Sequence, residues 1–409
     1  MPADPLPPHP TRILTATSLA HFVNDGTVFF VPVIVALLVP LRHLSPIEAS
    51  VLFVVYYATS SLLGLVIGWW ADRRGRPAAL MVVGIALLAA GLLGFAIVVA
   101  GGAGSAAYPF ALVAAGVTGF GASFYHPLGA ALLQGSFSTA QRGSALGING
   151  AFGSLGRALY PFLFFLTTLV LVTGVSILPF VILGLAVALV LAVTTRNFDL
   201  AARHRTSGSS RASDSVTAGI LALTGIAFVR SVALQGVAVW IPIYLTVARG
   251  VPATGYLGLA VTVMYVGGIL GQPVFGYAAN RWDRRMLVAV SSLGASLATF
   301  GYLFTSGDVS QILLFAIGVF TFSAFPLLMT LSADYVPRGS SSLANALVFN
   351  LGAGGGTIVG PLVVGALAAS SYAFLGSSLE VMAALGIGAA GLTALLPRAR
   401  KAEKTLLFG

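Results

Sequence analysis

The chain has 409 residues, of which 57% are hydrophobic and only 8% are charged. Soluble domains carry about a quarter of their residues as charged ones, so this composition excludes an ordinary soluble module and indicates a chain embedded in a lipid bilayer. The net charge of +10 does not indicate a nucleic-acid partner, because the basic residues lie between apolar runs. Cysteine is absent, which excludes disulfides and thiolate metal sites.

The chain begins with a Pro-rich segment, 1–12, that lacks the features of a signal peptide and is predicted to be a disordered tail. Apolar runs follow, each of about 20 residues or more, the length that crosses a bilayer as a helix. They are continuously apolar rather than alternating, which favours helices over the strands of a barrel. The predicted spans are 13–40, 46–71, 78–101, 106–134, 142–172, 175–195, 217–248, 254–280, 286–306, 309–334, 342–370 and 376–397.

One connection is longer and more polar than the others. Residues 196–216 are rich in Arg and Ser and are predicted to form a cytoplasmic linker. The linker separates an N-terminal six-helix bundle, 13–195, from a C-terminal six-helix bundle, 217–397, which is followed by a tail, 398–409. The predicted fold class is an all-α membrane protein with twelve transmembrane helices in two pseudo-symmetric bundles.

The basic residues are divided unevenly between the two sides of these spans. Nearly all of them fall in the termini and the even-numbered loops, whereas Arg42 and Arg249 fall on the other side. Arg157 and Arg230 fall inside spans. Because cytoplasmic loops carry the excess of Lys and Arg, both termini are predicted to be cytoplasmic, in a membrane of the bacterial inner (plasma) type.

The two halves of the sequence repeat one another. Asp25 and Pro32 in the first span correspond to Gln235 and Pro242 in the seventh, with the same spacing. Further pairs recur about 200–210 residues apart, namely Pro127 with Pro326, Asn149 with Asn350, and Pro161 with Pro361. Parallel six-helix repeats are typical of secondary transporters that bind substrate near the bilayer midplane between the halves.

The second span ends in the motif Gly68-Trp-Trp-Ala-Asp72-Arg73-Arg74-Gly75-Arg76-Pro77, and a degraded copy closes the eighth span. The motif resembles the signature that follows the second span in the major facilitator superfamily. The resemblance implies alternating access by rocking of two bundles, in which Asp72 lies near a helix N-terminus of the other half. The alternative is that the charges of the motif serve only to anchor the membrane topology. The gating residues that it implies are Gly68, Asp72, Arg73, Arg76, Asn280 and Arg284.

A finer resemblance rests on three segments. They are His21-Phe-Val-Asn24-Asp25, Phe124-Tyr125-His126-Pro127 and Gly150-Ala-Phe-Gly153-Ser154-Leu155-Gly156. These segments resemble the fosmidomycin-resistance-like branch of drug and metabolite exporters. Leu128 follows the His-Pro pair, where that branch commonly has an acid.

Asp25 is the most informative acid, because it lies near the middle of the first span. A carboxylate at that depth is costly and usually functional. His21 lies one turn before it, and His126 stands beside Pro127, which is expected to kink its helix. Asp25, His21 and His126 are therefore predicted to couple transport to protons, with buried polar packing as the alternative. The three could also form a metal site, but no further acid or Cys supports one, and none is predicted.

Arg157 and Arg230 place one cation in each half. A guanidinium binds carboxylates and phosphonates bidentately, so the pair is suited to an anionic substrate; alternatively, one Arg neutralises Asp25. Arg157 also shares one face of its helix with Asn149 and Gly153, because the three are spaced four residues apart. The predicted substrate-binding residues are Arg157, Arg230, Asn24, Tyr57, Tyr125, Gln235 and Tyr265.

No phosphate-binding loop, nucleophile motif or haem motif is present, so neither an enzyme nor a cofactor is predicted. The favoured function is a monomeric, proton-coupled antiporter that exports a small anionic or amphipathic organic compound. A proton-coupled uptake symporter for an organic anion is the second hypothesis. A sensor or lipid-handling protein without steady flux is the third.

Overall fold

A computed structural model describes residues 10–74, 77–137, 139–196, 216–279, 281–336 and 341–398, and in these ranges the chain is helical without strands. The predicted tails and linker fall almost entirely on 1–9, 197–215 and 399–409, outside the described residues.

The helices follow the predicted spans closely. In the first half they are α1 (Pro10–Arg42), α2 (Pro46–Arg74), α3 (Pro77–Val99), α4 (Ala107–Ala122), α5 (Tyr125–Ser136), α6 (Thr139–Thr168) and α7 (Leu178–Thr195). In the second half they are α9 (Ala218–Val247), α10 (Gly255–Ala278), α11 (Arg284–Phe304), α12 (Gly307–Phe322), α13 (Ala324–Asp334), α14 (Ser341–Ala346), the π-helical η3 (Leu347–Gly354), α15 (Gly355–Leu367) and α16 (Leu375–Leu392).

Within the described residues, eleven helical segments are long and apolar enough to cross a membrane. The predicted span 142–172 corresponds to α6, which is not among them. The reason is compositional, since α6 carries Asn149, Arg157 and several glycines among its apolar residues. The least apolar helix is therefore the one that contributes polar groups to the site described below.

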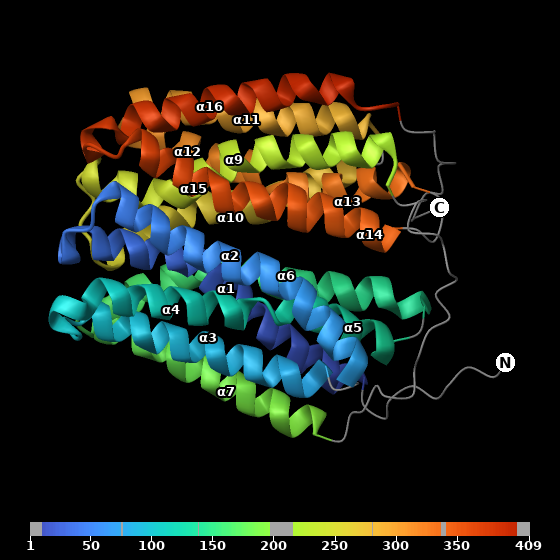
Figure 1. Cartoon of the computed structure of the whole chain (residues 1–409), viewed down its shortest axis with the longest axis horizontal. Coiled ribbons are helices and arrows are strands. Elements are labelled where there is room, and N and C mark those ends of the chain that lie inside the picture. The colour runs from blue at the N-terminus through green and yellow to red at the C-terminus, as the bar shows by residue number, and fades with distance from the viewer. Residues whose placement is uncertain are drawn as a thin grey trace. The chain divides into compact units, whose positions relative to one another are not determined.

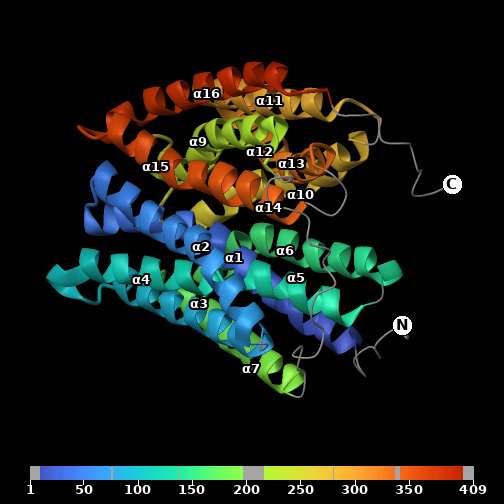
Figure 2. The same cartoon turned by 45° about the vertical axis from the view of Figure 1, so that its right-hand side comes forward.

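Two compact units make up the chain. Unit 1 comprises Met1–His204 and Leu245–Thr262, and unit 2 comprises Arg205–Tyr244 and Val263–Gly409. Within unit 1, α1 packs along α6, and α3 packs against α4 and α7; within unit 2, α11 packs against α12 and α16 (Figures 1 and 2). The bundle limits predicted from the linker stay a prediction.

The fourth and tenth spans are each broken at the same point of the repeat. The fourth divides between α4 and α5 at Ser123 and Phe124, and the tenth divides between α12 and α13 at Ser323. Pro127 and Pro326 stand in the first turn after each break, where a missing backbone N–H costs little. The repeat therefore extends to backbone geometry. The first break places His126 in the first turn of α5.

Glycines bring the first span of each half close to its fifth. A Cβ added at Gly156 of α6 would lie 2.2 Å from the backbone oxygen of Phe22 on α1. One added at Gly360 of α15 would lie 2.5 Å from the backbone oxygen of Val232 on α9. Small residues permit such backbone approach between membrane helices. We call the α1–α6 contact, built on Gly26, Gly153 and Gly156, the glycine seam.

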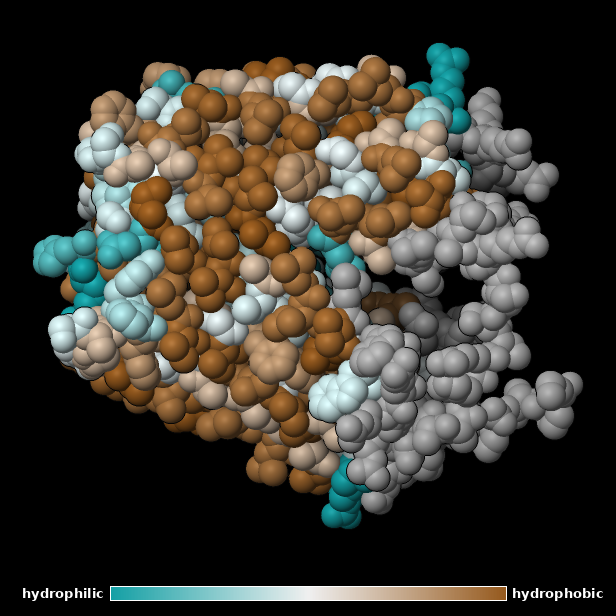
Figure 3. All heavy atoms as spheres, viewed as in Figure 1, coloured by the Kyte–Doolittle hydropathy of each residue, from teal (hydrophilic) through white to brown (hydrophobic). Residues whose placement is uncertain are grey.

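The outer faces of the helices are apolar. Figure 3 shows hydrophobic residues over most of the visible face and hydrophilic residues mainly near the helix ends. Exposed side chains on unit 1 include Leu62, Val66, Val113, Ile182 and Leu189. Soluble proteins rarely expose such large apolar surfaces to water, so this surface is suited to contact with lipid.

Candidate functional site

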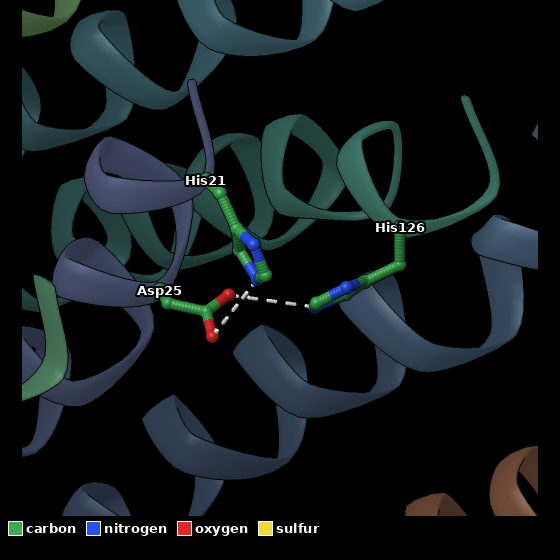
Figure 4. Close-up of side chains that lie close together, drawn as sticks. All are labelled: His21, Asp25 and His126. Atoms are coloured by element: carbon green, nitrogen blue, oxygen red, sulfur yellow. Dashed lines mark ion pairs between the residues drawn. The ribbon is translucent and has the colours of Figure 1, made fainter. Parts of the chain in front are cut away.

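The site is built around the carboxylate of Asp25, which lies in the interior of unit 1 with its side chain only 4% exposed. Residues of three helices reach it: His21 from α1, His126 from α5 and Arg157 from α6. Figure 4 shows both imidazoles directed towards the carboxylate, that of His21 from the same helix as Asp25 and that of His126 from another helix. We call Asp25, His21, His126 and Arg157 the carboxylate cluster.

The two oxygens of Asp25 have different partners. Oδ2 accepts hydrogen bonds from Arg157 Nε at 2.9 Å and from its NH2 at 2.8 Å, and lies 3.4 Å from His21 Nε2. Oδ1 accepts from Asn24 Nδ2 at 3.1 Å and lies 3.5 Å from His126 Nε2. A buried carboxylate needs a compensating charge and donors, and Arg157 supplies both at Oδ2. Oδ1 is held only by a neutral amide and a longer imidazole contact.

His21 is held by α6 through its other ring nitrogen. Nδ1 lies 2.8 Å from the backbone oxygen of Asn149 and 3.0 Å from its Oδ1. Because a carbonyl oxygen only accepts, Nδ1 carries the proton in the neutral ring. Nε2, which faces Asp25, has no hydrogen-bond partner. His21 therefore turns its free proton-accepting atom towards the carboxylate.

Tyr125 fixes this arrangement from α5. Its ring stacks on that of His21 with centroids 4.6 Å apart. Its hydroxyl donates to Asn149 Oδ1 at 3.0 Å and to the backbone oxygen of Thr17 at 3.1 Å. Gly153 makes room for the imidazole, because a Cβ there would lie 2.4 Å from His21 Nε2. The predicted shared face of Asn149, Gly153 and Arg157 is therefore the face that meets α1.

Several buried polar atoms around the cluster lack partners within the described residues. They include Asn24 Oδ1, Asn149 Nδ2 and the Tyr56 hydroxyl. Tyr56, on α2, also interacts electrostatically with Asp25. Buried polar groups are normally satisfied by protein or water, so this interior is suited to bound water next to the carboxylate.

The members of the cluster differ in accessibility. The side chain of His126 is 64% exposed and that of Arg157 is 23% exposed, whereas those of His21 and Asp25 are 11% and 4% exposed. A solute that reaches the cluster therefore meets His126 before it meets the acid.

Three members of the cluster, His21, Asp25 and His126, are also candidate metal ligands. Ligand atoms of His21, Asp25 and His126 all lie within 4.8 Å of one another. Two imidazoles and a carboxylate are ligands for divalent transition metals, but the Arg157 guanidinium already binds Oδ2. A divalent ion on Oδ1 would stand beside this fixed positive charge, so the donor set fits a metal poorly. The expectation of no metal site stays a prediction.

Arg230 has a different environment inside unit 2. Its Nε donates to Ser292 Oγ at 3.0 Å, and its NH2 donates to the backbone oxygens of Phe320 and Thr321 at 3.2 and 3.0 Å. These carbonyls belong to the last turn of α12, where the helix dipole favours a cation. Arg230 is 3% exposed. Its packing favours a structural role, and its predicted substrate contact stays a prediction.

The other predicted substrate-binding residues divide between the two units. Tyr57 lies beside Tyr56 on α2, with ring centroids 4.9 Å apart. In unit 2, Tyr265 is buried against Phe322 at 5.9 Å, and Gln235 is half-buried on α9. The carboxylate cluster thus brings together Asn24, Tyr125 and Arg157 of the predicted set.

Most of the predicted gating motif cannot be placed. The side chains of Asp72 and Arg73, and all of Arg76 and Asn280, lie outside the described residues. Gly68 of α2 faces Pro127, whose Cβ would lie 3.5 Å from an added Cβ.

The second copy of the motif has an ion pair. Arg284 NH1 donates to Asp334 at the end of α13, at 2.6 and 2.5 Å from the two carboxylate oxygens. Nearby, Asp283 caps α11 by accepting from the Arg285 backbone N–H at 2.9 Å. Hydrogen bonds from the Arg285 side chain lower the pKa of Asp283 below its usual value.

Two residues of the site, Asn149 and Tyr56, are not among the site residues predicted from the sequence. Asn149 joins His21 to Tyr125, and its four-residue spacing from Gly153 and Arg157 was the available signal. Tyr56 could not be separated from Tyr57 in sequence, because the two are adjacent and which of them turns inward depends on the rotation of α2.

Comparison with known proteins identifies relatives over nearly the whole chain. The family model described as Major Facilitator Superfamily matches residues 17–361 and 223–407. The chain is 25% identical over 375 residues to the fosmidomycin resistance protein of Escherichia coli (strain K12), covering 87% of this chain and 86% of that protein. It is 28% identical over 160 residues to the uncharacterized MFS-type transporter YfnC of Bacillus subtilis (strain 168), covering 39% of this chain and 36% of that protein.

Solved transporter structures share the fold. A bacterial homolog to the human lysosomal transporter Spinster, in an inward-facing and unoccupied conformation, superposes with a TM-score of 0.77 at 18% identity, covering 95% of this chain and 97% of that chain. The nucleoside transporter NupG superposes with a TM-score of 0.72 at 10% identity, covering 94% of this chain and 98% of that chain. At such identities the likeness concerns the fold alone.

Proposed function

Since the chain belongs to the Major Facilitator Superfamily, and is therefore a multi-pass membrane transporter rather than an enzyme, we propose that it is a proton-coupled antiporter. It exports a small anionic or amphipathic organic compound by alternating access, as a monomer in an inner (plasma) membrane with both termini cytoplasmic. Export is supported by the fosmidomycin resistance relative, at low identity. The two bundles, 13–195 and 217–397, would rock about the linker, gated by the motif around Asp72 and its copy at Arg284.

The observation that carries proton coupling is the buried carboxylate of Asp25 between two imidazoles. Asp25 can lose a compensating donor and gain a proton without leaving its place, since His21 Nε2 and His126 Nε2 lie 3.4 and 3.5 Å from its oxygens. Ionisable groups at this depth mark proton relays in transporters. Arg157 stays bound to Oδ2, so its positive charge compensates the Asp25 carboxylate when the acid has lost its proton.

Uptake of an organic anion together with protons is the second candidate. It is favoured by Arg157, whose guanidinium is more exposed than the carboxylate that it binds. An anion that drew Arg157 away from Asp25 would leave this acid to take up a proton, so anion and proton would move in the same direction.

Transport in proteoliposomes with an imposed pH gradient tests the proposal. In the antiport case, substrate accumulates on the acidic side of the membrane, and Asp25→Asn abolishes accumulation while exchange down a substrate gradient continues. Accumulation by Asp25→Asn equal to that of the wild type would overturn the coupling role. Accumulation on the alkaline side would support the symport candidate instead.

A further inference from the structure

The connection between α6 and α7 exposes large aliphatic side chains outside any helix. Residues 169–175 follow the end of α6, and the first four of them are aliphatic. Their exposed fractions are 60% for Leu169, 80% for Val170, 37% for Leu171 and 72% for Val172. No charged residue or histidine occurs from 158 to 195. We call residues 169–175 the apolar loop.

The apolar loop lies level with the ends of α1 and α3. An added Cβ at Gly174 would lie 2.6 Å from the Cα of Ala100, the residue that follows α3. The end of α3 is held by Arg42, the last residue of α1, whose Nε donates to the backbone oxygen of Val98 at 3.0 Å. An arginine at the end of a spanning helix extends its guanidinium to the headgroup level. The exposed aliphatic side chains therefore lie where headgroups meet acyl chains, on the side predicted to be non-cytoplasmic.

Much of the backbone of the apolar loop is paired within the segment. The N–H groups of residues 169–171 donate to carbonyl oxygens in the last turn of α6. The hydroxyl of Ser176, a buried residue, lies 3.1 and 3.0 Å from the carbonyl oxygens of Leu171 and Val172. In lipid, backbone polar groups must find partners within the protein. Pairing of this kind lowers the cost of removing the loop from water.

The equivalent connection in unit 2 has small and polar side chains. It leaves α15 through residues 368–371, with the sequence Ala-Ala-Ser-Ser. Ser370 and Ser371 are exposed. The aliphatic tip is therefore not required by the turn that joins the fifth span of a half to the sixth, and unit 2 supplies an internal control for it.

The helix before the apolar loop gives this tip a use. α6 carries Arg157 and is not among the described segments that are apolar enough to cross a membrane. Attachment to a bilayer surface strengthens with the apolar area that is buried in it. Aliphatic side chains at the outer end of α6 would add the contact with lipid that the composition of the helix itself does not provide.

We propose that the apolar loop inserts its aliphatic side chains into the outer leaflet, at the level of the first acyl carbons, and thereby anchors the outer end of α6. The lipid surface is its partner. Protein interfaces are enriched in aromatic residues, Met and Arg, none of which occurs in the apolar loop. The loop has no charge to pair with a headgroup, so insertion depends on the acyl chains and not on the charge of the lipid.

Single thiols test this placement, because the chain has no cysteine. Val170→Cys and the unit 2 control Ser370→Cys each receive one fluorescent label, in nanodiscs that hold one copy of the protein. We expect phospholipid brominated near the headgroup end of its acyl chains to quench the label on Val170→Cys several-fold more strongly than that on Ser370→Cys. Aqueous iodide should show the reverse order.

Two results of this experiment would overturn the inference. In the first, iodide quenches the label on Val170→Cys as strongly as that on Ser370→Cys, so the loop lies in water. In the second, the label on Val170→Cys is shielded from iodide only when two copies share a disc, so a second copy covers the loop. Insertion involves neither the carboxylate cluster nor the direction of transport, so this test stands apart from that of the proposed function.

A charge at the tip of the loop provides a second test. With the label on Val172→Cys, the added substitution Val170→Asp should increase quenching by iodide several-fold, because a carboxylate is costly among acyl chains. Ser370→Asp in the same background should leave the quenching unchanged. Both loop positions are exposed, so melting in detergent should match that of the wild type. A label that stays shielded in Val170→Asp would show that something other than lipid covers the loop.

Discussion

In the described part of each unit one arginine lies within a membrane-spanning helix, half-buried Arg157 in unit 1 and buried Arg230 in unit 2, and the two are neutralised in different ways. In unit 1, Arg157 is paired with the carboxylate of Asp25. In unit 2, Arg230 donates to Ser292 and to two carbonyls at the end of α12. A carboxylate can be neutralised by a proton, whereas helix carbonyls cannot. Under the proposed function the first arginine therefore belongs to a pair that can respond to pH, whereas the second donates to the carbonyls that end α12.

The repeat shows how this difference arose on one scaffold. Gln235 occupies the position in the seventh span that corresponds to Asp25, and Thr357 occupies the position in the eleventh that corresponds to Arg157. Unit 2 therefore lacks both members of the ion pair at the equivalent depth. Both units nevertheless keep the helix break and the close glycine contact between the first and fifth spans of the half.

The largest effect is expected from separating Arg157 and Asp25. Arg157→Gln leaves a buried carboxylate without its partner, which should lower the free energy of unfolding by about 3–5 kcal/mol. Asp25→Asn combined with Arg157→Gln should recover most of that loss, because no charge is then left alone. Thermal melting in detergent measures both. A double variant as unstable as the sum of the single variants would show that the two residues do not act as a pair.

Arg230→Leu should cost about 1–3 kcal/mol, because Ser292 and the carbonyls of Phe320 and Thr321 lose their donor. The pH dependence of transport should not change, since Arg230 donates to a serine hydroxyl and two backbone carbonyls, none of which titrates near neutrality. Melting temperature and a pH profile of exchange check this. A shifted profile would place Arg230 in the coupling mechanism and remove the contrast between the units.

Alanine at a glycine in the contact between the first and fifth spans should affect the two units differently. In Gly153→Ala the new Cβ would lie 2.4 Å from His21 Nε2, so the imidazole must move away from Asp25 and the pH profile of transport should shift. In Gly356→Ala it would lie 2.4 Å from the backbone oxygen of Phe228, which cannot rotate away. That variant should lose about 1–3 kcal/mol of stability and keep the wild-type profile. Identical pH profiles of transport in the two variants would count against a role of His21 in proton coupling.

The smallest effect is expected at Asp283, which caps α11 outside the membrane. Its lowered pKa means that the ionised form stabilises the fold above its unfolded pKa of about 3.9, and that this contribution disappears as the pH falls through the folded value. Asp283→Ala should cost about 0.5–1 kcal/mol at neutral pH. Asp283→Asn should keep the cap and lose only this acidic pH dependence. Melting curves from pH 3 to 7 distinguish the two.

Hydropathy was sufficient for all spans except the one that became α6, because a helix in lipid must satisfy its own backbone and is therefore continuously apolar. It missed the division of the fourth and tenth spans, although Pro127 and Pro326 marked both places. In the site, helical spacing correctly placed Arg157 with Asn149 and Gly153. Pairing of an arginine with Asp25 was the alternative to substrate binding, and the structure bears it out for Arg157. Spacing within one helix could not decide it, since the two residues are 132 positions apart and the contact of α1 with α6 depends on glycines.

The glycine seam also limits how the cluster can open. At the seam the backbone of α6 at Gly156 lies directly against that of α1 at Phe22 and Gly26, while the rings of Tyr160 and His21 fill the space at Gly26 and Gly153, so α1 and α6 are closely interlocked. Asp25, His21 and Arg157 belong to these two helices, whereas His126, the fourth member of the carboxylate cluster, belongs to α5. The break at Ser123 and Phe124 separates α5, a helix of 12 residues, from α4. Any displacement of α5 that exposed the acid would have to break the contacts of Tyr125 with His21, Asn149 and Thr17, so opening the cluster has a definite cost in contacts.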